Sequence, residues 1–313
     1  RFLGLLLAEG AAIDLRSLLA TDVWETSKRH CTTRERGPMK FRPCIDLHNG
    51  VVKQLVGGSV QDESAEQPKE NFASDKSATH YADMYSNDAL TGGHVISIGA
   101  GNEEAAVAAL KAYPGGLQYG GGVTPENARK WLSAGASHVI VTSYVFKDGK
   151  LDFDKLKEMV ELVGKDNLVL DLSCRSKDGK FFVCTDRWQK FTDLEVSGDT
   201  LNMLAEYCDE FLVHAVDVEG KMQGIEDDLV QMLGECSPIP VTYAGGASTM
   251  GDLDKVKAIG DGKVDLTIGS GLDIFGGALS YEAVVAWQRK EEIMARKEGM
   301  GGTFSASFGR TYS

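Results

Sequence analysis

From Phe41 onward, short apolar runs rich in β-branched residues alternate with longer stretches that place apolar residues three or four positions apart. The short runs resemble buried parallel strands, and the longer stretches have the period of amphipathic helices. The strands are expected to end near Asp46, Ile98, Tyr119, Thr142, Leu172, Ala215, Tyr243 and Ile268. The helices are expected at 79–90, 103–112, 125–134, 152–163, 200–208, 225–236, 249–259 and about 279–297.

Two helix starts have local signals that support this interpretation. Thr124 precedes Pro125 and Glu126, which places an N-cap before a proline in the first helical position. Thr249 and Asp252 have the spacing of a capping box. Eight strands that alternate with eight helices predict a (β/α)8 TIM barrel. A doubly wound open sheet is the alternative, although it would seldom repeat eight units so evenly.

An internal repeat divides the expected barrel into two halves. Three motifs of the first half recur 124 to 127 residues later in the second half. Such a repeat predicts a barrel built from two half-barrels. The matching segments are 44–47 with 169–172, 119–124 with 243–248, and 141–143 with 268–270.

The repeat also predicts where the chemistry lies. The C-terminal strand ends form the reaction face of such a barrel, so Asp46 of strand 1 and Asp171 of strand 5 are expected on opposite sides of it. Glycines after strands 3 and 7 let backbone amides approach a phosphate, and the helices that follow point their positive ends toward it. The expected cradle residues are Gly121, Gly122, Thr142 and Ser143 in the first half and Gly245, Gly246, Gly269 and Ser270 in the second.

Together these features predict a long substrate with a phosphate at each end and two central carboxylates, one acting as a base and one as an acid. The pattern requires no nicotinamide cofactor and no metal. A lone glycine pair would more often be a tight turn, and a lone strand-end aspartate a helix cap, so the interpretation depends on the matched duplication. Gly99 and Gly101 lack the third glycine of a dinucleotide fingerprint, and the hydrolase elbow Gly-x-Ser-x-Gly does not occur.

Two long polar segments, 57–78 and 173–193, are candidates for lids over the site. Unstructured connections of this length in a compact barrel are usually functional or disordered. The second segment contains Arg175, a candidate substrate contact, and Trp188, which we expect either to stack on a planar substrate or to pack on the barrel rim. His214 ends strand 6 and is expected to point into the mouth of the barrel, where a histidine alone is more often structural.

Composition and charge narrow the classes of partner. The chain has 33 basic and 46 acidic residues, a formal net charge of −13, which argues against nucleic-acid binding. No apolar run is long enough to cross a bilayer. The six cysteines have no CxxC spacing and the six histidines no HxxxH spacing, so neither a disulfide framework nor a structural zinc is expected. We therefore expect a monomer that binds a small phosphorylated molecule.

The two ends of the chain differ from the expected barrel domain, 39–297. Residues 1–38 contain a short apolar segment and then a basic, hydroxyl-rich stretch, which is typical of organelle transit peptides. Acidic residues such as Asp14 and Glu35 count against that interpretation. We expect a plastid location, in the chloroplast stroma, with a disordered extension and a cytoplasmic protein as the alternative. Residues 298–313 are expected to form a C-terminal tail.

Several of these motifs resemble one known family, the phosphoribosylformimino-aminoimidazole carboxamide ribotide isomerases of L-histidine biosynthesis, in their eukaryotic form. The resemblance extends over about residues 40–290, and its most specific segments are 41–50, 169–175, 211–220, 243–247 and 272–277. It implies a TIM barrel without a cofactor. It also implies an Amadori rearrangement, in which a ribotide with two phosphates passes from the aminoaldose to the aminoketose form.

Residue roles follow from this resemblance by position. Asp46 would be the base that removes the proton at C2 of the ring-opened imine, and Asp171 the acid that protonates the ring oxygen. His214 stands where bacterial members have a threonine that assists the acid, and Trp188 matches a tryptophan that packs on the substrate.

The resemblance has departures, and it leaves alternatives open. Gln54 and Thr124 stand where bacterial members have arginines, so phosphate contacts are expected mainly from backbone amides. The nearest alternative is the sister cyclase barrel that makes imidazole glycerol phosphate, which needs ammonia from a glutaminase whose motifs are absent here. A non-catalytic barrel that binds phosphorylated metabolites is another, although it would not need both aspartates. A second activity in tryptophan synthesis is also conceivable.

Overall fold

The computed structural model describes residues 37–56, 70–186 and 188–305. The chain divides into two units, Arg1–Arg34 and Glu35–Ser313, and every described residue belongs to the second. Most of the leader expected in 1–38 and the last eight residues of the expected tail therefore lie outside the described part of the chain.

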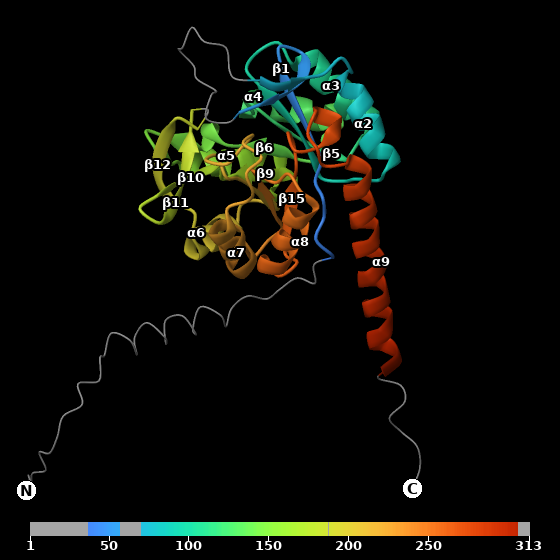
Figure 1. Cartoon of the computed structure of the whole chain (residues 1–313). Coiled ribbons are helices and arrows are strands. Elements are labelled where there is room, and N and C mark those ends of the chain that lie inside the picture. The colour runs from blue at the N-terminus through green and yellow to red at the C-terminus, as the bar shows by residue number, and fades with distance from the viewer. Residues whose placement is uncertain (1–36, 57–69, 187, 306–313) are drawn as a thin grey trace, which may run out of the picture. The chain divides into compact units, whose positions relative to one another are not determined.

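Eight parallel strands form the barrel that the sequence predicts (Figure 1). A parallel bridge between Phe41 and Leu266 joins the last strand to the segment before the first, and Arg42 N donates to Leu266 O across this seam at 2.8 Å. The strands end within a few residues of their expected positions, so the fold prediction is confirmed. They are β1 (Cys44–His48), β4 (Gly93–Ile98), β5 (Leu117–Gly120), β6 (Val139–Val141), β9 (Leu168–Asp171), β13 (Glu210–His214), β14 (Val241–Ala244) and β15 (Val264–Thr267).

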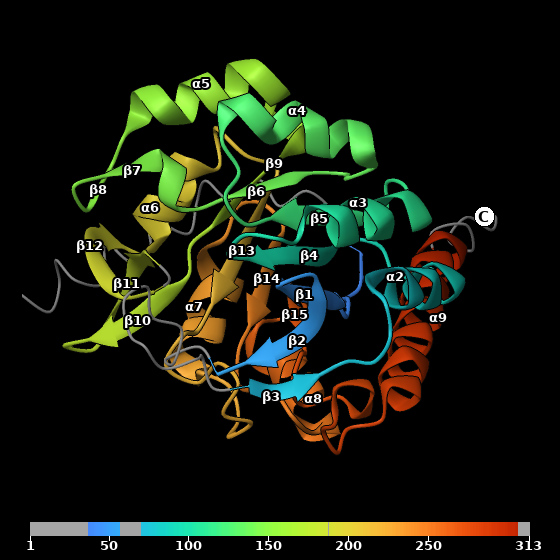
Figure 2. The same cartoon turned by 90° about the horizontal axis from the view of Figure 1, so that it is seen from above.

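The expected helices surround these strands, as Figure 2 shows. The capping box is confirmed, because Thr249 N donates to the Asp252 carboxylate at 2.9 Å and Asp252 N donates to Thr249 Oγ1 at 3.2 Å. No helix in the described ranges combines the length and the apolar composition that a membrane span requires. The helices are α2 (Ala78–Asn87), α3 (Glu103–Ala112), α4 (Pro125–Ala134), α5 (Phe153–Val163), α6 (Gly198–Leu204), α7 (Asp227–Cys236), α8 (Met250–Ile259) and α9 (Tyr281–Ser305), of which α6 is shorter and α9 longer than expected.

The apolar core has two parts because each barrel strand has two buried faces. The larger part includes residues such as Leu168 and Leu170. A small separate cluster of Ile140, Val169 and Leu212 fills the inside of the barrel. Since side chains alternate along a strand, Val169 shares its inward face with Asp171 two residues later. The inner cluster is thus the apolar floor beneath the reaction face.

Below this floor the barrel is filled by a polar network around Arg42. Its Nε lies 2.7 Å from Asp265 Oδ2, and its Nη2 lies 3.5 Å from Glu210 Oε2. Gln118 Nε2 and Thr242 Oγ1 donate to the two oxygens of Glu210 at 3.1 and 2.8 Å. Arg42 and Glu210 are buried and Asp265 is partly buried, and burial is tolerable for charged groups only when they are paired and hydrogen-bonded.

The first expected lid begins next to an antiparallel pair at the edge of the barrel. β2 (Val51–Leu55) pairs with β1 on one side and with β3 (Glu70–Ala73) on the other. Residues 57–69 of this segment lie outside the described ranges. The described part of the segment thus includes the strand β3 and is not only a loop.

The second segment, 173–193, is not unstructured as expected. It forms a three-stranded antiparallel sheet of β10 (Cys174–Lys177), β11 (Lys180–Thr185) and β12 (Lys190–Glu195). Asp178 and Gly179 both have positive φ, 54° and 75°, as a two-residue hairpin of the primed type requires. The Asp-Gly pair between two strand-like runs was therefore a hairpin signal that the prediction overlooked. Shorter elements complete the fold: the hairpin β7 (Phe146–Lys147) with β8 (Lys150–Leu151), and the 3-10 turns η3 (Ser143–Val145), η4 (Lys165–Asn167) and η5 (Asp273–Phe275).

The buried network predicts a large stability loss for Arg42→Met. Removing the cation leaves the buried Glu210 and the partly buried Asp265 without their positive partner, which costs roughly 3–5 kcal/mol. Lys76→Met is the control, because Lys76 forms an exposed pair with Asp75 at 3.5 Å and should change stability by less than about 1 kcal/mol. Denaturant unfolding measures both, and equal losses would show that the network does not stabilise the barrel.

Candidate active site

Asp46 lies within β1, and its carboxylate is held by the neighbouring strand. Gln54 of β2 donates from Nε2 to Asp46 Oδ2 at 2.8 Å. Burial, together with the negative charge of Glu219, raises the pKa of Asp46 to about 7, against the opposing effects of His214 and Gln54. A carboxylate with this pKa can gain and lose a proton near neutral pH, as a general base must.

Asp171 ends β9, on the opposite side of the barrel, and is bound by several donors. Thr142 Oγ1 donates to Oδ2 at 3.0 Å, and the backbone N and hydroxyl of Ser173 donate to Oδ1 at 2.8 and 2.6 Å. His214 Nδ1 lies 3.7 Å from the same Oδ1. Burial alone would raise the pKa of Asp171, but His214 and Ser173 hold it below its ordinary value. Asp171 is therefore an ionised carboxylate.

His214 ends β13 and balances this charge. Burial would lower the pKa of its imidazole, but pairing with Asp171, supported by Glu219 and Asp46, raises it to about 9. Nδ1 also lies 3.3 Å from Ser173 Oγ, so Nδ1 faces Asp171 and Nε2 is the ring nitrogen away from it. Near neutral pH the pair thus consists of an anionic aspartate and a cationic histidine.

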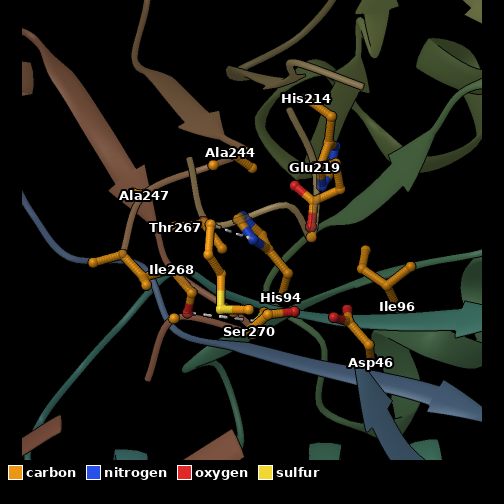
Figure 3. A pocket seen from close by; sticks show the side chains of 17 residues that line it. Asp46, His94, Ile96, His214, Glu219, Ala244, Ala247, Thr267, Ile268 and Ser270 are labelled. Carbon is orange, nitrogen blue, oxygen red and sulfur yellow. Dashed lines mark hydrogen bonds between the residues drawn. The ribbon is translucent and has the colours of Figure 1, made fainter. Parts of the chain in front are cut away.

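Glu219 is a further carboxylate of the site to which the sequence analysis gave no role. Figure 3 shows Glu219, His214 and Asp46 around one cavity. Burial raises the pKa of Glu219, while the charge of His214 opposes that effect. Its sequence signal was its place four residues after Ala215, at the end of a strand, in a segment already counted in the family resemblance. An acidic residue in the loop after a barrel strand is therefore a candidate for the active site, even where it does not end the strand itself.

The expected site residues divide between two cavities at the mouth of the barrel. Asp46, His214, Gly245, Gly246, Gly269 and Ser270 line the first. The second has a volume of about 570 Å³, and Gly121, Gly122, Thr142, Ser143, Asp171 and Trp188 line it. Each half-barrel therefore supplies one glycine cradle and one aspartate. Each aspartate, however, lines the same cavity as the glycine cradle of the other half-barrel.

The glycines that follow β5 and β14 have conformations that other residues rarely adopt. Gly121 has φ +106°, and a Cβ there would lie 2.1 Å from Ser97 O. Gly246 has φ +76°, and a Cβ there would lie 1.9 Å from Gly224 O. Helices α4 and α8 begin a few residues after these glycines, and helix N-termini favour anions. The cradles are thus suited to phosphate through backbone groups.

Trp188 and Arg175 have different surroundings. The Trp188 ring lies 6.1 Å from the His214 ring, and Trp188 has a φ of 67°, which is unusual for a bulky residue. Arg175 lies on β10 outside the described linings of both cavities, with Nε 2.9 Å from Asp217 Oδ1 and its guanidinium over Phe191. In this conformation Trp188 lines the second cavity beside His214, and Arg175 is bound to Asp217.

Basic side chains are scarce at the site. Among the described residues that line the two cavities, the basic ones are His94 and His214. Burial lowers the pKa of His94 to about 3, so His94 is neutral. The described residues also contain no cluster of histidine, cysteine and carboxylate side chains that could hold a metal ion. His214 therefore provides the cationic charge of the described lining.

Comparison with known proteins gives consistent matches. A family model described as "Histidine biosynthesis protein" matches residues 40–276. A Medicago truncatula protein named 1-(5-phosphoribosyl)-5-((5-phosphoribosylamino)methylideneamino) imidazole-4-carboxamide isomerase, chloroplastic, is 53% identical over 260 residues, which cover 82% of this chain and 83% of that protein. Isomerases of the same name from Neurospora crassa and Saccharomyces cerevisiae are 49% and 46% identical, and each match covers 80% of this chain and 99% of the relative.

The cradle geometry predicts that Gly246→Ala weakens substrate binding. The added methyl group would force the backbone near Gly224 apart, and we expect KM to rise by about tenfold or more because the cradle is misplaced. Gly262→Ala is the matched control, since Gly262 also has positive φ, +64°, but no atom lies within 4 Å of its added Cβ. Steady-state kinetics measure KM for both variants, and a thermal melt checks that both are folded. Equal KM values would show that the cradle at Gly246 does not bind the substrate.

Proposed function

The chain belongs to the histidine biosynthesis protein family, and on that premise we propose that it catalyses an Amadori rearrangement by general acid–base chemistry. It is an aldose–ketose isomerase of histidine biosynthesis. The substrate is the aminoaldose ribotide with a phosphoribosyl group at each end, which corresponds to the two groups in the relatives' name. The two glycine cradles support this assignment, because each would bind one phosphate.

Asp46 is the base of the proposed reaction. Once the furanose ring has opened to the imine, Asp46 removes the proton from C2. The electrons of the C2–H bond form a C1–C2 double bond, and those of the imine move to nitrogen. The enaminol then becomes the ketone when C1 gains a proton and the C2 hydroxyl loses one, so the product has the composition of the substrate.

The Asp171–His214 pair is the acid that opens the ring. The ring oxygen takes a proton as its bond to C1 breaks and the nitrogen lone pair forms the imine. The resemblance implies that Asp171 donates this proton itself. Its lowered pKa, its donors from Thr142 and Ser173, and its ion pair with His214 instead favour the imidazolium as the group that holds the proton. Asp171 then fixes and charges the imidazole.

The single observation that supports this proposal most strongly is the order of two pKa values across the barrel. The pKa of Asp46 is raised to about 7, and the pKa of His214, beside the ionised Asp171, is raised to about 9. Between these two values the base is ionised while the acid is still protonated, as general acid–base catalysis within one site requires. Trp188 lines the second cavity and would shield the imine from water. A plastid location is supported by the chloroplastic Medicago relative.

Asp46→Asn is expected to abolish turnover and to leave substrate binding nearly unchanged, since loss of a general base costs ~10²–10⁴-fold in kcat. The assay follows the aminoaldose ribotide by chromatography to a product of equal mass. Asp199→Asn, an exposed aspartate at the start of α6, is the control and should keep full activity. Near-native kcat in Asp46→Asn would refute the assignment.

The pH profile of kcat/KM is expected to be bell-shaped. Activity should rise as Asp46 ionises near pH 7 and fall as His214 loses its proton near pH 9. Glu219→Gln removes a negative charge that raises both values, so both limbs should move to lower pH. If Glu219→Gln instead lowers kcat by ~10²–10⁴-fold at every pH and leaves both limbs in place, Glu219 and not His214 is the general acid.

A further inference from the structure

Gln54 connects the base to one of the phosphate cradles. Its side chain is 1% exposed, and both ends of its amide are bonded. Nε2 donates to Asp46 Oδ2 at 2.8 Å, and Oε1 accepts from Ser270 Oγ at 3.3 Å. Ser270 follows β15 and lines the same cavity as Asp46. One buried amide thus lies between the reacting carboxylate and a hydroxyl of the cradle.

The chain of hydrogen bonds continues outward to β3. Asn71 Nδ2 donates to Ser270 Oγ at 3.2 Å and to Gly220 O at 2.8 Å. Each donor from Asn71 through Ser270 and Gln54 points toward Asp46, and hydrogen bonds aligned in one direction strengthen one another. The antiparallel pair β2–β3 therefore contributes two polar side chains to the mouth of the barrel.

Gly269 provides independent support for a precise placement of Gln54. A Cβ at position 269 would lie 2.3 Å from Gln54 Oε1 and 3.5 Å from Cys44 Sγ. Gly269 does not have positive φ, so backbone conformation does not require glycine there. The space that glycine leaves is filled by the Gln54 amide. Gly269 thus leaves the space that the Gln54 side chain needs, in addition to its place in the cradle.

We propose that Gln54 is a positioning residue for the proposed reaction, which orients the Asp46 carboxylate toward the substrate and couples that orientation through Ser270 to the phosphate cradle after β15. The inference rests on the proposed role of Asp46 as the base. The bond from Gln54 fixes Oδ2 and therefore the direction in which Oδ1 faces. Because Ser270 is shared, the cradle and the base cannot be displaced independently.

The proposal has a signature that simple packing does not have. The bond from Gln54 favours the ionised form of Asp46 and lowers its pKa, against the effects of burial and Glu219. Gln54→Met keeps the volume and loses the bond. It should move the acidic limb of the kcat/KM profile upward by roughly half to one pH unit, as one net hydrogen bond implies. We expect kcat to fall about tenfold and KM to change by less than about threefold.

Gln118→Met is the matched control. Gln118 is also buried inside the barrel and donates to Glu210, away from Asp46. Its replacement should lower thermal stability and leave the acidic limb where it is in the native protein. If Gln54→Met gives the same result as Gln118→Met, with lower stability and an unchanged limb, Gln54 only fills space and the proposal is wrong.

Ser270→Ala and the double variant test the coupling, and they serve as the test if Gln54→Met does not fold. Ser270→Ala should raise KM and move the acidic limb in the same direction by a smaller amount. In the double variant the two movements should not add, because both act through one bond to Asp46. The coupling between Asp46 and the cradle would be refuted if Ser270→Ala left the acidic limb of the kcat/KM profile unchanged. It would also be refuted if the shifts of the two single variants added in the double variant. Asp46→Asn in the same series separates a failure of the Gln54 proposal from a failure of the proposed base. If Asp46→Asn stays active, the role of Asp46 as the base is wrong.

Discussion

The active site depends on the pairing of His214 with Asp171 at the ends of two adjacent barrel strands. The barrel places Asp46, Asp171 and Glu219 at its partly closed mouth, and burial opposes the ionised form of each. Within the described lining of the two cavities, His214 is the cation that offsets them. It stays protonated because Asp171 is close, and Asp171 stays ionised for the same reason. Asp46 lies across the barrel, receives less of this compensation and therefore has a raised pKa.

This distribution of charge is compatible with the proposed substrate, which has two phosphates although the protein is acidic. The described cradle linings contain no lysine or arginine, so phosphate would be bound by backbone amides, hydroxyls and the N-termini of α4 and α8. Backbone groups serve this purpose only where glycine allows the chain to approach, as the close contacts at Gly121 and Gly246 show. Asp46, the proposed base, is connected to one cradle through Gln54. Binding and chemistry thus share the same strand ends.

Much of the fold and part of the site could be predicted because their signals are local. Strand runs, helix caps and the duplicated aspartate and glycine motifs lie within a few residues of one another, and the repeat doubled each signal. The roles of Gln54 and Arg175 could not be predicted in this way, because they depend on partners far along the chain: Gln54 contacts Ser270 and Arg175 contacts Asp217. The sheet β10–β12 is a different case, since its Asp-Gly turn was visible but was interpreted as part of a loop.

In the proposed mechanism the proton of the Asp171–His214 pair is on His214. The most direct test is the titration of the histidine ring nitrogens by NMR in the 15N-histidine-labelled protein, with His214→Gln to assign the signal. We expect a midpoint near pH 9 for His214, which falls toward an ordinary histidine value of about 6.5 in Asp171→Asn. A midpoint near 6.5 in the native protein, unchanged in Asp171→Asn, would contradict it.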